Sequence, residues 1–127
     1  MREGLVELAS ELFAKVGRTT EGQRRIHGYR HVYQFEIDGV QEFYVRVEEG
    51  VLEVGEGVYE GEYGMVSLVK TDSDTLEKVL KGKLRALDAS KEGKWVIRAR
   101  AYSGELLYTL LRIGRDMTAE ELLAAQG

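Results

Sequence analysis

Cysteine and proline are absent from the 127-residue sequence, and tryptophan occurs once. A chain without cysteine has no disulfides and offers no thiolate to a metal, and it suits a reducing compartment, so we expect a cytoplasmic protein. Long uncharged apolar runs are also missing, because Glu7, Glu11 and Lys15 interrupt the first apolar segment. The sequence therefore predicts neither a secretory signal nor an integral membrane span.

An excess of positive charge is lacking as well. The formal net charge is −4, whereas a protein that neutralises the phosphates of a duplex needs a concentrated excess of lysine and arginine. Nucleic acid is therefore not an expected partner. One segment, residues 18–31, is locally basic, and we interpret it as a solvated connector that faces an otherwise acidic surface.

The overall composition is that of an ordinary globular protein, with 43% hydrophobic and 31% charged residues. The length falls within the usual size of one domain. Because no repeat and no linker-like segment interrupts the pattern, residues 1–127 are predicted to form a single domain.

Apolar residues that recur at steps of three and four mark the first predicted helices. They cover residues 3–16, with charged residues between them. Several capping side chains in residues 71–74 predict a short helix over residues 74–81, and Leu84 and Leu87 indicate a further helical turn.

Strict alternation of apolar and polar residues marks the predicted strands. Asp38-Gly39 and Glu49-Gly50 are tight-turn sequences that join neighbouring strands into antiparallel hairpins. The predicted strands lie at residues 31–37, 43–47, 51–54, 65–70 and 95–101.

Two helices are predicted at the C-terminal end, one capped by Ser103 and one capped by Thr118. The first has a broad apolar face formed by leucines, and apolar strand positions supply Phe35, Phe43 and Trp95. Such a pattern fits a packed core, and it also fits a ligand cavity. If a cavity is present, we expect the helix around residues 104–113 to form one wall or its lid.

Residues with the spacing of a catalytic or metal site are hard to find. His27 and His31 are four apart, but Gly28 and the strand that follows oppose a helical metal pair. No serine lies in a nucleophile-elbow motif. A catalytic triad would need a serine, a histidine and an acid from distant parts of the chain, and no motif predicts that they come together. Only Tyr33 and Ser67 are candidate polar groups for a cavity. We therefore expect a non-enzymatic protein without a cofactor or metal.

From Met65 to about Gly114, the order of features resembles the sterol carrier protein type-2 family. An apolar strand is followed by Thr71-Asp72-Ser73-Asp74, a short helix, Gly82-Lys83-Leu84, another turn, Gly93-Lys94, a strand and a leucine-rich helix. Upstream, residues 33–37 and 43–47 resemble the opening hairpin of the family. The resemblance covers most of the chain.

This resemblance implies an α+β fold, in which helices cover one face of a five-stranded, mostly antiparallel sheet. It also implies a hydrophobic tunnel for sterols, phospholipids, fatty acids or similar molecules. The expected partner is then a lipid or fatty-acyl-like small molecule, and the expected role is its non-catalytic binding or transfer. The predicted ligand-binding residues are Phe35, Phe43, Leu68, Leu76, Leu80, Trp95, Ile97, Leu107 and Leu110.

A second interpretation stays open. The same fold could have a filled interior and serve as an interaction or dimerisation module that works with an enzyme partner, in which case the chain could form a homodimer. The sequence does not separate this interpretation from lipid binding.

Overall fold

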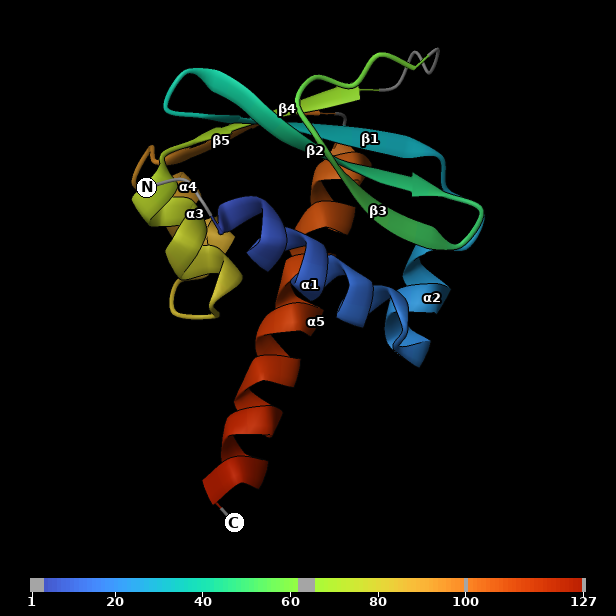
Figure 1. The fold of residues 1–127 in the computed structure, drawn as a ribbon, viewed down its shortest axis with the longest axis vertical. Coiled ribbons are helices and arrows are strands. Elements are labelled where there is room, and N and C mark those ends of the chain that lie inside the picture. The colour runs from blue at the N-terminus through green and yellow to red at the C-terminus, as the bar shows by residue number, and fades with distance from the viewer. Residues whose placement is uncertain (1–3, 62–65, 100, 127) are drawn as a thin grey trace.

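The computed structural model describes residues 4–61, 66–99 and 101–126, with the backbone alone for residues 101–102 and 118–126. Five strands form one mixed sheet in the order β3-β2-β1-β4-β5, and all helices lie on one face of it (Figure 1). The predicted α+β class is confirmed. In chain order the elements are α1 Leu5–Gly17, α2 Thr20–Ile26, β1 His31–Ile37, β2 Val40–Glu48, β3 Val51–Glu56, β4 Val66–Thr71, α3 Ser73–Leu80, α4 Ala86–Lys91, β5 Trp95–Arg98 and α5 Ala101–Gln126.

The first three strands form the predicted meander. Asp38 and Gly39 have φ values of 51° and 84°, and Glu49 and Gly50 have values of 50° and 76°. Two consecutive residues of positive φ are characteristic of the tight turns that match strand twist, so both hairpins close with little strain. Strand β4 then pairs parallel to β1, whereas the other three strand pairs are antiparallel.

The side chains of the sheet alternate between a face that meets the helices and a face that does not. Tyr33, Phe35 and Ile37 of β1 are buried under the helices, next to Phe43 and Val45 of β2. Together with apolar residues of α1, α3 and α5 they make one continuous hydrophobic core. Burial of this apolar surface is the main favourable contribution to folding.

The opposite face is crossed in part by the chain that follows β3. Gln34 of β1 is buried there, and its side-chain amide donates to the carbonyl oxygens of Phe43 and Gly57 and accepts from the backbone N–H of Tyr59. These bonds satisfy a polar group in the middle of the sheet, which would otherwise be costly to bury. They also explain why β1 is buried on both faces.

Two helical segments differ from the sequence-based expectation. Residues 20–26, expected to be a connector, form α2, whose first turn is capped by Thr19 through the N–H of Gly22. The two predicted C-terminal helices are one continuous helix, α5, because nothing in the sequence after Ser103 stops the helix. Gly114 lies within it and lets α5 approach Leu12 of α1 closely.

Helix α5 begins under the sheet and runs away from it, so that its C-terminal half extends beyond the other elements (Figure 1). Among the helices of the described residues, none combines the length and apolarity needed to cross a bilayer.

Candidate functional site

The predicted ligand-binding residues are largely brought together, in the core between the sheet and the helices. The Phe35 and Phe43 rings stack with centroids 4.7 Å apart, and Trp95 packs edge-on against Phe35 at 6.0 Å. Ile97 is partly buried against the same core. From the helical side, the core receives Leu76, Leu80, Leu107 and Leu110. Whether these residues also contact a ligand stays a prediction.

Leu68 is placed differently from the prediction. It lies opposite Gln34 of β1 in the parallel register, whereas its neighbour Val69 lies opposite Phe35. Since successive strand residues point to opposite faces, Leu68 lies on the face away from the helices. It does not belong to the core cluster, and the prediction that it lines a cavity under the helices is wrong.

The interior is closely packed where the aromatic side chains meet. Phe35, Phe43 and Trp95 are each 1% exposed or less, and none of them lines any of the four pockets described among residues 4–61, 66–99 and 101–126. A ligand would therefore enter from elsewhere, or the core would have to rearrange.

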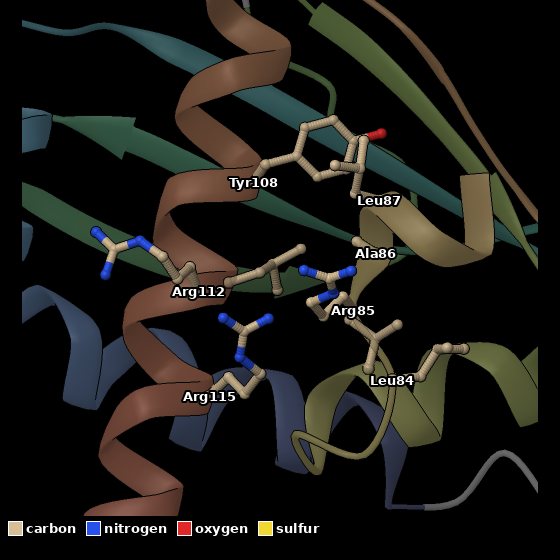
Figure 2. A pocket seen from close by; sticks show the side chains of 9 residues that line it. Leu84, Arg85, Ala86, Leu87, Tyr108, Arg112 and Arg115 are labelled. Atoms are coloured by element: carbon tan, nitrogen blue, oxygen red, sulfur yellow. The ribbon is translucent and has the colours of Figure 1, made fainter. Parts of the chain in front are cut away.

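One pocket combines a mainly apolar lining with charged groups at its edge. It lies between α5 on one side and α3 and α4 on the other, has a volume of about 190 Å³ and is open to solvent (Figure 2). For scale, an engineered apolar cavity of about 150 Å³ accommodates benzene. The lining residues are Val79, Leu84, Arg85, Ala86, Leu87, Tyr108, Leu111, Arg112 and Arg115.

The pocket lies next to the predicted ligand-binding residues of α3 and α5. Val79 of α3 and Leu111 of α5 face the pocket, and the residues beside them in the same helices, Leu80 and Leu110, belong to the core. The apolar floor of the pocket is therefore continuous with the core. From the sequence, Leu84 and Leu87 predict only a helical turn, because the α5 residues that share the pocket with them are distant along the chain.

Three arginines line the pocket, and because Arg85 lies far from Arg112 and Arg115 in the sequence, no local pattern predicts that they meet. Arg85 donates to Asp88 from Nε at 2.7 Å and from Nη2 at 3.0 Å. Arg112 bonds Asp116 at 3.1 Å and also pairs with Glu21 of α2, at 2.5 Å. Arg115 lies 3.8 Å from Asp116, beyond hydrogen-bonding distance.

A second polar cluster is buried under the start of α5. His31 Nε2 and Ser67 Oγ are 2.6 Å apart, and the Tyr33 hydroxyl donates to the carbonyl oxygen of Ser103 at 2.5 Å. Burial lowers the pKa of His31, so the imidazole is neutral at neutral pH. Burial, with the neighbouring Tyr29 adding to it, raises the pKa of Tyr33 above its usual range.

This histidine and serine meet over a long sequence distance, although no motif predicts the contact. Ser67 is 2% and His31 5% exposed, so in this conformation a substrate cannot reach the hydroxyl. The pair ties β1 to β4, and Tyr33 ties β1 to α5. His27 is exposed, whereas His31 is buried and contacts Ser67.

Two further observations concern metal binding and the buried tryptophan. No group of three histidine, aspartate or glutamate side chains within the described ranges could hold a metal ion. Trp95 is buried, and its indole N–H has no hydrogen-bond acceptor among those residues. A buried donor without a partner costs about 1–3 kcal/mol, so native structures seldom keep one without a reason.

Several solved structures with this fold are sterol carrier protein domains. Sterol carrier protein domain 2 of Helicoverpa armigera superposes with a TM-score of 0.64 at 21% identity, over 84% of either chain. Palmitated SCP2L2 from Aedes aegypti gives 0.62 at 20% identity, over 87% of this chain and 95% of that one. UbiJ-SCP2, a ubiquinone synthesis protein, gives 0.61 at 13% identity, over 84% and 87%.

The sequence itself matches no family model, and no curated protein is similar to it. The protein thus has the fold of the sterol carrier protein type-2 domains, as the resemblance predicted, at sequence identities that establish the fold alone.

Proposed function

We propose that the protein binds an elongated apolar molecule, such as a fatty-acyl chain, without catalysis, and that the molecule enters through the pocket between α4 and α5. The observation that carries the proposal is this pocket, which is open to solvent and has an apolar floor continuous with the core. The sterol carrier domains of the same fold support it, since one of them is described as palmitated.

The driving force would be the removal of chain methylenes from water, worth about 0.8 kcal/mol each before the costs of association. Leu87 contributes to the entrance, because it lines the pocket and is nevertheless 50% exposed. A ligand that covers Leu87 would bury apolar surface that the protein alone leaves in water. Short chains would fit the pocket as it stands, and longer ones would require a wall to move.

The movable wall is α4 rather than α5. Helix α4 has six residues, and no side chain caps its N-terminus, so few local interactions hold it. Helix α5 is held at several points, by the bond from Tyr33 to Ser103, by the pair of Arg112 and Glu21 and by the close approach of Gly114 to α1. After α4 moves, a long chain would extend toward the predicted residues Leu80, Leu107 and Leu110.

The test compares two matched variants of α5. Leu111 lines the pocket and is 7% exposed, whereas Leu106, 6% exposed, lines a different hollow. Leu111→Gln and Leu106→Gln should lower the free energy of unfolding by similar amounts, because each buries a side-chain amide that has no hydrogen-bond partner. Calorimetric titration with C6 to C14 carboxylates should show affinity that rises with chain length in the wild type and in Leu106→Gln, and much weaker binding in Leu111→Gln.

Equal binding by both variants would move the site away from this pocket. If the wild type bound no chain of any length, lipid binding itself would be refuted.

The second candidate function is an interaction or dimerisation module with a filled interior, and the close packing of Phe35, Phe43 and Trp95 favours it. Native mass spectrometry separates the two. Co-purified lipid in a monomer supports the carrier, and a lipid-free dimer supports the module.

A further inference from the structure

Two arginine side chains bring positive charge to the edge of the pocket. Arg85, from the connection between α3 and α4, and Arg115, from α5, both extend their guanidinium groups into the space between these elements (Figure 2). The guanidinium group of Arg112 points away from it in the same view. Asp88 lies near Arg85 and Arg115: hydrogen bonding from Arg85 lowers the pKa of Asp88 most, and the charges of Arg85, Lys91 and Arg115 lower it further.

The three arginines differ in how closely acidic side chains pair with them. Arg112 is engaged by Glu21 and Asp116, so it serves to tie α5 to α2. Asp88 occupies Nε and Nη2 of Arg85. For Arg115, the described residues offer only the long contact to Asp116, whose other oxygen accepts from Arg112.

A guanidinium group suits an oxyanion, because its planar set of N–H donors matches the two oxygens of a carboxylate or phosphate. The position also suits an anion, because the arginines lie at the solvent side, where the head group keeps part of its hydration. An ion forced onto the apolar floor would lose all of it at high cost. The chain and the head group of one molecule would thus be bound by different parts of the same pocket.

We infer that the pocket selects amphiphiles with an oxyanion head, carboxylate or phosphate, which Arg115 and Arg85 hold at the entrance while the apolar chain lies on Val79, Leu84 and Leu111. The inference rests on the proposed function of this pocket and adds the class of ligand that it prefers. Arg115 contributes most, because its described contact with Asp116 is 3.8 Å long and leaves its N–H donors for a head group. Arg85 contributes through the N–H donors that Asp88 does not bind.

The test measures the dissociation constants of decanoate, decyl phosphate and decanol for the wild type, Arg115→Gln, Arg85→Gln and the control Arg98→Gln. Arg98 is exposed on β5 and does not line the pocket. We expect the wild type to bind decanoate on the order of tenfold more tightly than decanol, as one charged hydrogen-bonded contact provides. In Arg115→Gln this preference should fall to about twofold or less, with a smaller fall in Arg85→Gln and none in Arg98→Gln.

The outcomes separate this inference from the function on which it rests. If decanoate and decanol both bind the wild type but their ratio is the same in all four proteins, the pocket binds chains and the arginine head-group site is refuted. If neither binds, the proposed function fails first. Inorganic phosphate distinguishes a free anion from a head group, since phosphate that bound as tightly as decyl phosphate would overturn the requirement for a chain.

Discussion

The core under the sheet and the pocket beside α5 are both built from apolar side chains, yet one is closed and the other open. Under the sheet, Phe35 and Phe43 come from paired strands, whose fixed spacing brings the rings into a stack. Beside α5, a six-residue helix meets a long one. The paired strands bring large aromatic rings into close contact, whereas the short helix leaves an open pocket beside α5.

The size of the side chains on α4 explains much of the gap. Its buried residues are Ala86 and Ala89, and alanine is too small to reach across to α5. Ala86 lines the pocket, whereas Ala89 is fully buried away from it. The small side chain of Ala86 therefore helps to leave the pocket open.

The largest expected difference between the two regions is the cost of removing an apolar side chain. Phe35→Ala should lower the free energy of unfolding by about 3–5 kcal/mol, because it opens a cavity in a packed core. Leu87→Ala should cost less than about 1 kcal/mol, since Leu87 is half exposed. Urea denaturation measures both. Similar costs at the two positions would contradict the distinction between a closed core and an open pocket.

A smaller effect is expected from filling space on α4. Ala86→Leu should place its side chain in the pocket, leave the free energy of unfolding within about 1 kcal/mol of the wild type and abolish decanoate binding. The matched change Ala89→Leu should cost about 1–3 kcal/mol, because the added atoms find no room. Thermal denaturation and calorimetric titration of both variants check this. An Ala86→Leu protein that still bound decanoate as the wild type does would place the ligand elsewhere.

The smallest effect concerns the polar cluster at the edge of the closed core. Burial holds the pKa of His31 in the folded protein below its ordinary value of 6.5, so the unfolded chain binds more protons when the pH falls below that value. Stability from this group is fully present above about pH 6.5 and is lost as the pH falls toward the lower pKa of the folded state. Denaturation at a series of pH values should show this loss, and His31→Gln should reduce it. An unchanged slope in His31→Gln would assign the pH dependence to other groups.

Much of the fold could be predicted because local patterns determine it. The alternation in residues 31–37 and the turn at Asp38-Gly39 specify a hairpin without knowledge of the rest of the chain. Helix α2 was missed because it is short and rich in arginine, so its apolar periodicity is weak. The single long α5 was missed because a capping-box sequence at Thr118 can also lie inside a helix.

The candidate site was harder to predict from the sequence, since it depends on contacts between distant segments of the chain. Leu68 was assigned to the wrong face because β4 has apolar residues on both sides, so only its register with β1 decides which one faces the helices. Arg85 lies in the connection before α4 and Arg115 lies in α5, so their approach depends on how α4 and α5 pack. The meeting of His31 with Ser67 likewise follows from the parallel pairing of β1 and β4.

The central claim is that an apolar chain binds between α4 and α5 rather than inside the aromatic core. An NMR titration of the isotope-labelled protein with decanoate tests it most directly, because every assigned amide and methyl group reports its own surroundings. The account predicts saturable shifts at Val79, Leu84, Leu87 and Leu111, with line broadening along α4 as that helix moves. Shifts centred on Phe35, Phe43 and Trp95, with the residues of the pocket unchanged, would contradict it.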